Sequence, residues 1–201
     1  MKNCLLFLFF LGLSFSTYAQ GNTGSTETNK KKKEKVETTD NNSKKNYSDW
    51  KSYTQTNVSV QYPATWTLDE SGLMGSSFFL FSPISNEQDL FKENMNLLIV
   101  DLAQYGLADM DLEQYAEVSI AQLPNIIQNY KFKASAKESK NGKTYYQVEY
   151  TGSQMNYNLH WLQQFWVIDG KAYVLSFTSE QEQFYTYKGI AQKILDSFKI
   201  K

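Results

Sequence analysis

Two short turn signals divide the second half of this chain into long alternating segments. They are the dipeptides Asn141-Gly142 and Asp169-Gly170. Asn-Gly and Asp-Gly favour the tight turns that join neighbouring antiparallel strands, and two residues are too few for the crossover that parallel strands need. The strands expected around these turns, with a further break after Gly152, are 131–137, 144–151, 157–168 and 171–178. The sequence therefore predicts an antiparallel sheet.

The first half of the sequence also predicts strands, and two of them have the pattern of strands buried on both faces. Residues 57–62 alternate between polar and apolar side chains, and Pro63 ends the pattern. A second, short strand is expected to begin at Trp66. Residues 76–81 and 96–102 are nearly continuous apolar runs, which are typical of strands covered on both faces.

The first of two expected helices lies between these groups of strands. Apolar residues recur every three to four positions from Leu112 to Tyr130, which predicts an amphipathic helix. Asp111 and Gln114 are placed to form a capping box at its start. Pro124 is expected to kink or split this helix, because proline lacks the amide hydrogen and clashes with the preceding turn.

The second helix is expected from about Glu180 to Phe198, with a capping box of Ser179 and Glu182. Its apolar stripe consists of Phe184, Tyr187, Ala191, Ile194, Leu195 and Phe198. Amphipathic helices bury their stripes on the faces of a sheet. The expected fold class is therefore α+β, a mostly antiparallel sheet flanked by two main helices.

The first nineteen residues predict a cleavable export signal. Lys2 supplies a positive charge, 5–15 is an apolar run, and Thr17 and Ala19 are small residues before the expected cleavage point. The run is shorter than the roughly 20 residues of a membrane span. An uncleaved anchor or a buried strand are the alternatives. A lipoprotein signal has its cysteine after the apolar run, whereas Cys4 precedes it. The expected product is secreted or periplasmic, lacks cysteine and has no integral membrane span.

Composition and charge divide the remaining chain near residue 50. Residues 20–49 contain almost nothing to bury, which predicts a disordered lysine-rich linker before a folded domain at 50–201. Residues 20–51 carry eight lysines and five acids, whereas 52–201 carry eleven lysines and sixteen acids. Lysine runs can bind nucleic acid, but the chain lacks arginine, the residue best suited to base and phosphate contacts. We expect a spacer, or a weak anchor on an anionic membrane or envelope polymer, and no nucleic-acid partner.

No catalytic or cofactor-binding set is recognisable. The single histidine, His160, lies in an expected strand on the face of Leu162 and Trp166, where a packed or edge imidazole is the expectation. The sequence has no nucleophile elbow, phosphate loop, dinucleotide fingerprint or His-Glu-x-x-His motif. Nothing places the carboxylates of Glu149 and Asp169 together. Enzymatic activity and a bound cofactor are therefore not expected.

One acidic cluster resembles a hard-cation site. It consists of Asp109, Asp111 and Glu113. A calcium loop would need further oxygen ligands, a turn glycine and a glutamate at position twelve. Acids at the start of a helix are already explained by capping and by the helix dipole. No metal site is therefore expected.

Aromatic residues make up 15% of the chain. The residues that could bind a partner are Trp66, Trp161, Trp166 and Tyr146. Tyrosine and tryptophan are enriched at interfaces, but they also suit the interior of a sheet. Both interpretations stay open from the sequence alone.

Several segments together resemble the PsbP-like superfamily, which includes the PsbP subunit of photosystem II, a yeast Ran-binding import factor, and bacterial PsbP-related and DcrB-like envelope proteins. The similar segments are VSVQYPATW at 58–66, ENMNLLIVDL at 93–102, LEQYA at 112–116, GKAYVLSFT at 170–178 and ILDSFKI at 194–200. Their order and spacing cover nearly the whole expected domain.

This resemblance implies an α/β/α sandwich and a role as a binding or assembly factor, not an enzyme. It does not carry a ligand across. The chain has no arginine for a Ran-type interface, and no set of histidine and carboxylates that could be transferred from the photosystem subunit.

Three functional hypotheses follow from these patterns. The first is an exported, non-catalytic binding or assembly factor that acts on an envelope protein or cell-surface polymer. The second is a small-ligand or polysaccharide binder that uses an aromatic cleft, which exposed and clustered Trp66, Trp161 and Trp166 would favour. The third is an enzyme that uses carboxylates alone, which two buried acids with a raised pKa facing one cleft would favour.

Overall fold

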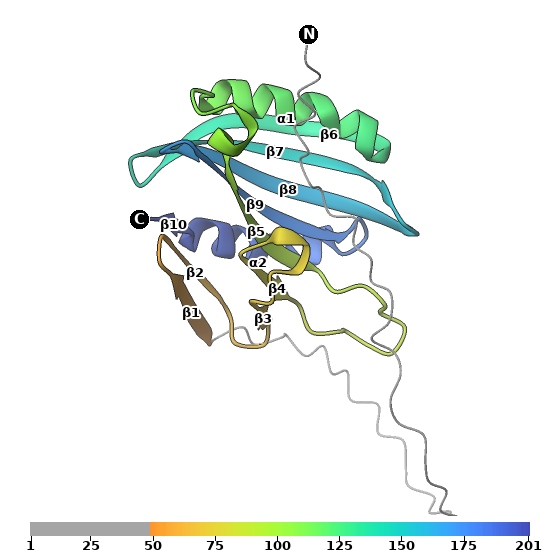
Figure 1. The fold of residues 1–201 in the computed structure, drawn as a ribbon. Coiled ribbons are helices and arrows are strands. Elements are labelled where there is room, and N and C mark those ends of the chain that lie inside the picture. The colour runs from red at the N-terminus through yellow and green to blue at the C-terminus, as the bar shows by residue number, and fades with distance from the viewer. Residues whose placement is uncertain (1–48) are drawn as a thin grey trace, which may run out of the picture. The chain divides into compact units, whose positions relative to one another are not determined.

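The computed structural model describes residues 49–201 (Figure 1). The expected export signal at 1–19 and nearly all of the expected lysine-rich linker at 20–49 lie outside the described residues. The described part contains two sheets and two main helices. Neither helix is long and apolar enough to cross a membrane.

The larger sheet has seven strands, and every neighbouring pair is antiparallel. In spatial order they are β3 (Thr67–Asp69), β4 (Phe78–Phe81), β5 (Asn94–Asp101), β9 (Lys171–Glu180), β8 (Tyr157–Ile168), β7 (Lys143–Gln154) and β6 (Gln128–Lys140). Two short 3-10 helices interrupt the chain between these strands: η1 (Leu73–Gly75) lies between β3 and β4, and η2 (Leu102–Tyr105) follows β5.

The two turn signals form the expected hairpins. Asn141 and Gly142 have φ angles of 52° and 75°, and Asp169 and Gly170 have φ angles of 51° and 69°. Two successive residues with positive φ are typical of a type I′ turn. These turns join β6 to β7 and β8 to β9, as the sequence predicts.

The strand expected at 144–151 continues through Gly152 to Gln154, so the break before β8 lies at 155–156 and not directly after Gly152. A Cβ atom at Gly152 would lie 2.8 Å from the carbonyl oxygen of Gln128 and would overlap the side chain of Ile127. Glycine is therefore needed here for the close approach of the neighbouring segment rather than for a turn.

The smaller sheet contains β1 (Trp50–Gln55), β2 (Val58–Pro63) and β10 (Lys199–Ile200), with β2 in the centre. The sequence predicts β2 but gives no strand at β1, where Tyr53 is the one buried residue. A polar edge strand lacks the apolar alternation that makes a strand recognisable.

Helix α1 (Leu112–Ile126) has the expected capping box, in which Gln114 N–H donates to Asp111 and the Gln114 side chain accepts from Asp111 N–H. The helix ends two residues after Pro124. The expectation that the helix continues to Tyr130 is wrong, because Tyr130 lies in β6. α1 packs against β6, β7 and β8.

Helix α2 (Phe184–Ser197) buries the expected apolar stripe, but its expected start is wrong. Ser179 and Glu180 belong to β9, where they pair with His160 and Leu159 of β8. The helix therefore begins at Phe184, and its first residue is not capped by a side chain.

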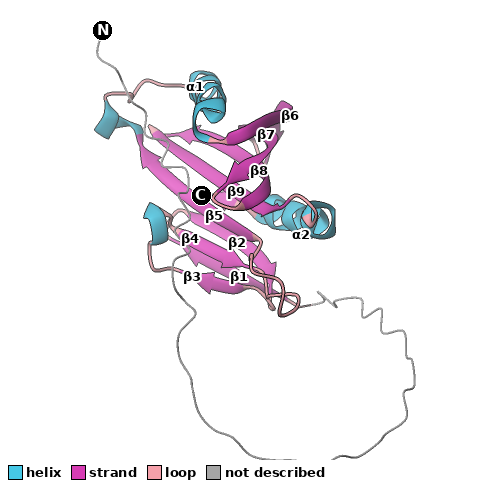
Figure 2. Cartoon of the chain, turned by 90° about the vertical axis from the view of Figure 1, so that its right-hand side faces the viewer, coloured by secondary structure: helices cyan, strands magenta, loops and turns pink. Residues whose placement is uncertain are grey.

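The helices cover opposite faces of the seven-stranded sheet, as Figures 1 and 2 show. Under α1 lies one core, which includes Tyr115, Leu123 and Trp161. On the other face, α2 and the small sheet enclose a larger core, which includes Trp66 and Trp166. The expected α+β sandwich is confirmed.

Candidate functional site

The three tryptophans proposed as partner-binding residues lie in the core. Trp66, Trp161 and Trp166 are 3%, 1% and 4% exposed. Trp161 stacks on Tyr150 under α1, with ring centroids 5.1 Å apart, whereas the other two lie on the α2 face of the sheet. The exposed, clustered arrangement that would favour the second hypothesis is therefore absent from these three positions, because helices cover both faces.

Tyr146 is half-buried and joins a polar contact between α1 and the sheet. Its hydroxyl donates to Glu113 Oε1 over 3.1 Å, and Lys137 Nζ donates to Glu113 Oε2 over 2.8 Å. The ammonium of Lys137 lowers the pKa of Glu113. Exposed ion pairs of this kind contribute little to stability.

Of the acidic cluster that resembles a cation site, Asp111 caps α1 and Glu113 forms the ion pair with Lys137. Among residues 49–201, no three His, Cys, Asp or Glu side chains are arranged to hold a metal ion. The two carboxylates singled out in the sequence also lie apart. Asp169 is in the turn after β8, whereas Glu149 pairs with Leu162 in the middle of that strand.

His160 is a packed imidazole, as expected. It is 6% exposed, and its ring lies flat on the ring of Phe184, with centroids 3.4 Å apart. Its Nε2 lies 2.9 Å from Glu149 Oε1. Burial lowers the pKa of His160, although the neighbouring carboxylate opposes this shift. The imidazole therefore joins β8 to β7 and to α2 inside the fold.

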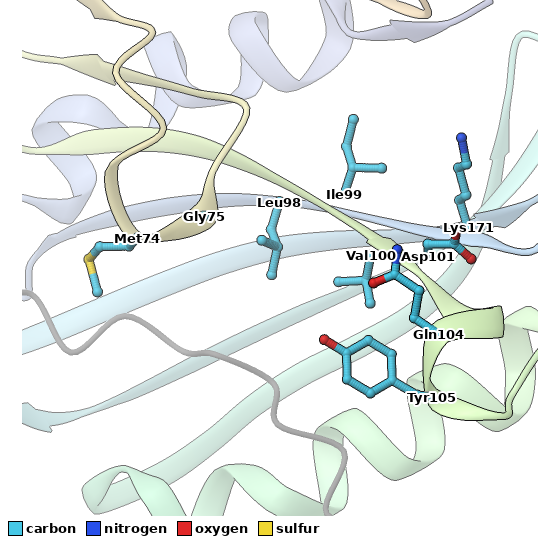
Figure 3. Close-up of a pocket in the computed structure, with 9 residues that line it drawn as sticks. All are labelled: Met74, Gly75, Leu98, Ile99, Val100, Asp101, Gln104, Tyr105 and Lys171. Atoms are coloured by element: carbon cyan, nitrogen blue, oxygen red, sulfur yellow. The ribbon is translucent and has the colours of Figure 1, made fainter.

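The candidate site is a cavity of about 670 Å³ beside β5 (Figure 3). Its lining residues come from η1, β5, η2 and the start of β9, and they are Met74, Gly75, Leu98, Ile99, Val100, Asp101, Gln104, Tyr105 and Lys171. A concave site with mostly apolar walls and a few polar groups is typical of a binding pocket. The lining includes no histidine, cysteine or serine.

The cavity exists because β4 is shorter than β5. β4 pairs with β5 only from Asn94 to Leu97, and the preceding chain then turns away through η1. β9 continues to pair with the other edge of β5 as far as Asp101. Residues 98–101 therefore form a strand segment that is paired on one edge only within the described structure.

The side chains of this segment alternate between the two cores. Leu98 and Val100 pack partly against the core under α1, and Ile99 packs partly against the core under α2. All three remain partly exposed at the cavity. Figure 3 shows Ile99 pointing away from the side on which Leu98 and Val100 lie, while Tyr105 lies on that latter side.

The polar end of the cavity carries nearly balanced charge. Asp101 and Lys171 are cross-strand neighbours at the end of β5 and β9. One oxygen of Asp101 accepts the N–H of Ala103 over 3.1 Å and so caps η2. The cavity therefore combines apolar walls with one carboxylate, one ammonium and the amide of Gln104.

The sequence does not single out these residues, because it predicts 96–102 as a strand covered on both faces. One signal was available in the glycines at Gly72 and Gly75, which end any upstream extension of β4. Both have positive φ angles of 76°. Because the turn lies shortly before Phe78, β4 cannot extend upstream, and it pairs with only four of the eight residues of β5.

The sequence matches the PsbP family over residues 45–200. Comparison with curated protein sequences finds no significant match. Similar solved structures include cyanobacterial PsbP (CyanoP) from Synechocystis, with a TM-score of 0.56 and 17% identity over 76% of this chain and 92% of that one. PA94 from Pseudomonas aeruginosa gives a TM-score of 0.53 and 9% identity, and the match covers 74% of this chain and 94% of PA94. LpqN from Mycobacterium tuberculosis gives a TM-score of 0.50 and 14% identity, and the match covers 72% of this chain and 83% of LpqN.

The family match spans both sheets and both helices, and the similar structures share the fold at low sequence identity. The order of the elements also agrees with the resemblance seen in the sequence. The chain belongs to the PsbP family.

Proposed function

We propose that this protein is an exported, non-catalytic binding or assembly factor that acts on an envelope or extracellular partner. The observation that carries the proposal is the cavity beside residues 98–101, where a strand edge and apolar side chains face a concave space of about 670 Å³. A non-catalytic role is supported by the lining, which offers one carboxylate and one ammonium but no histidine or nucleophilic serine or cysteine.

The family context supports the envelope as the place of action. LpqN, which shares the fold, is described as involved in cell envelope biogenesis of Mycobacterium tuberculosis. The expected export signal at 1–19 would deliver this chain to the same kind of compartment. Fold alone does not transfer a partner, so the proposal must be tested at the cavity itself.

Site-specific photocrosslinking in the native host tests this proposal. A benzophenone amino acid replaces Tyr105, which lines the cavity and is 45% exposed. The matched control replaces Tyr185, a tyrosine of α2 that is 79% exposed and does not line the cavity. We expect one envelope or secreted component to crosslink at position 105 and not at position 185.

Two results would contradict the proposal. Equal crosslinking at both positions would indicate non-specific contact. No capture at position 105, together with a soluble sugar or lipid that raises the melting temperature, would replace a macromolecular partner with a small ligand.

A further inference from the structure

We propose that the cavity receives an extended, uncharged segment of the partner, which adds to the large sheet as a strand beside residues 98–101. This inference rests on the function proposed above and specifies how the partner is recognised. The backbone of β5 is the reason to expect a strand rather than a helix or a folded surface.

The alternation of backbone groups along β5 identifies the groups that face the cavity. Ser82 N–H donates to the carbonyl of Glu93, and Ser77 N–H donates to the carbonyl of Leu97. Odd-numbered residues of this strand therefore point their backbone groups toward β4, and even-numbered residues point theirs toward β9. Ile99 accordingly presents both its N–H and its C=O to the cavity.

Among the described residues, the last backbone hydrogen bond across this edge is the one from Ser77 to Leu97. The N–H of Ile99 and of Asp101 lie beyond it. A strand edge with open donors and acceptors is a template for another extended chain, and addition of a strand is an established mode of peptide recognition. The exposed length, 98–101, would accept about four residues, or roughly 13 Å.

The walls of the cavity select a single chain segment as the occupant. η1 contributes Met74 and Gly75 on one side, and η2 contributes Gln104 and Tyr105 on the other. The edge between them is recessed, so the protruding edge of a folded sheet meets η1 and η2 before it reaches Ile99. The sheet edges of a second folded copy of this chain, such as β3 and β6, would meet η1 and η2 in the same way.

The free edge at residues 98–101 differs in charge from the outer edge of the sheet at β6. The outer strand β6 is largely exposed and carries four lysines, Lys131, Lys133, Lys137 and Lys140. Lysines on an edge strand oppose pairing with other chains. At residues 98–101 the only charge is Asp101, and Lys171 lies opposite it in the register. The balanced pair favours a segment without net charge.

The side chains define the pattern of the segment. A residue opposite Leu98 or Val100 would share their face of the sheet with Tyr105, so apolar side chains are expected there. In an antiparallel arrangement, a residue opposite Ile99 would exchange two backbone hydrogen bonds with it, so proline is excluded at that position.

Selection from a displayed library tests the inference without knowledge of the natural partner. Random ten-residue peptides are selected for binding to the chain that starts at Gln20, the residue after the expected export signal. Each enriched peptide is then synthesised as a series in which a single backbone amide is N-methylated at each position in turn. We expect N-methylation to weaken binding at least tenfold at alternate positions and to have little effect between them. A helical or side-chain-only mode would not produce a two-residue period.

Amide hydrogen exchange of the wild-type protein gives the second measurement. In the free protein the amide of Val100, which points toward β9, is expected to exchange at least tenfold more slowly than that of Ile99. Addition of the selected peptide should slow the Ile99 amide at least tenfold and leave the Val100 amide unchanged. Ile99→Pro removes the backbone donor that faces the cavity and keeps every donor that faces β9, although it also replaces the side chain that packs on the core under α2. It should weaken binding of the selected peptide by at least tenfold.

The outcomes separate this inference from the proposed function. If no peptide is enriched, or if enriched peptides leave the Ile99 exchange rate unchanged, strand addition is wrong, whatever is captured at position 105. If a peptide protects Ile99 but position 105 captures nothing in the host, the edge binds peptides and the proposed envelope role is wrong. If Ile99→Pro fails to fold, the exchange measurement on the wild-type protein decides.

Discussion

At the scale of single residues, Glu93 is a buried carboxylate with an incomplete set of partners. It is 1% exposed, and one oxygen accepts the hydroxyl of Ser82 over 3.1 Å. Its other oxygen has no hydrogen-bond partner among the described residues. Burial raises the pKa of Glu93, and the carboxylates of Asp89 and Glu180 raise it further.

A raised pKa in the folded state means that ionised Glu93 destabilises the fold. The free energy of unfolding that protonated Glu93 provides is therefore lost as the pH rises through that pKa. We expect Glu93→Gln to increase the free energy of unfolding at pH 8 by on the order of 1 kcal/mol, and by less as the pH falls toward 5. Urea denaturation at both pH values measures this. Glu87→Gln, an exposed position of the same loop, is the matched control. Equal stability of Glu93→Gln and the wild type at pH 8 would contradict the assignment.

His160 should show the opposite dependence on pH. Burial lowers its pKa from the usual 6.5, so the folded protein favours the neutral imidazole. The stability that neutral His160 contributes is fully present above pH 6.5, the pKa of the unfolded state. It is lost as the pH falls from that pKa through the lower pKa of the folded state. His160 is the single histidine of the chain, so its NMR titration is unambiguous. We expect a midpoint below 6.5 in the folded protein, and a still lower one in Glu149→Gln, because that carboxylate raises the pKa. A folded midpoint above 6.5 would contradict the prediction and would show that the carboxylate of Glu149 outweighs burial.

At the scale of elements, two glycines should respond to alanine in opposite directions. Gly152 in β7 lies against Gln128 at the start of β6, where a Cβ would meet the carbonyl oxygen at 2.8 Å. Gly189 lies inside α2, and a Cβ there meets nothing within 4 Å. We expect Gly152→Ala to lower the free energy of unfolding by about 2 kcal/mol, and Gly189→Ala to raise it by about 0.5–1 kcal/mol. Thermal denaturation of both variants distinguishes these effects, and a stabilised Gly152→Ala would show that β6 is not held so closely.

Local chemistry explains which elements the sequence predicts correctly. The hairpins at Asn141 and Asp169 and the capping box at Asp111 depend on a few neighbouring residues, and all are found. The start of α2 depends instead on pairing across space. Ser179 and Glu182 fit a capping box, but Ser179 is held by β8 as part of the sheet. The polar strand β1 is missed for the same reason, since its place is set by β2.

The candidate site was less predictable than the fold, because it results from a difference in length between two strands. The sequence places apolar residues at 97–100, and Gly72 and Gly75 mark a turn before β4, but neither pattern gives the register in which pairing with β4 stops at Leu97. The burial of the tryptophans also depends on packing between elements that are distant in the sequence. Alternation assigns Trp161 and Trp166 to faces of a strand, yet only the packing of α1 and of α2 determines that neither face is exposed.

At the scale of the whole molecule, the core on the α2 face joins distant parts of the chain. β1 supplies Tyr53, whose ring lies 5.4 Å from that of Phe78 and whose hydroxyl donates to Glu70 over 2.8 Å. Trp50 packs partly against the same core. The C-terminal strand β10 pairs with β2 in the same small sheet. The family match begins at residue 45, shortly before this sheet.

The small sheet leads to a prediction about where the independently folding unit begins. A chain that starts at Tyr47 retains β1, so we expect its free energy of unfolding to equal that of the chain from Gln20 within about 0.5 kcal/mol. A chain that starts at Thr56 lacks β1 and exposes the core beneath Tyr53, which should cost at least about 2 kcal/mol. Urea denaturation of the three chains compares these values directly. A loss of more than 1 kcal/mol on removal of residues 20–46 would mean that those residues also stabilise the folded domain, whereas an unchanged stability without β1 would show that the small sheet contributes little to the core.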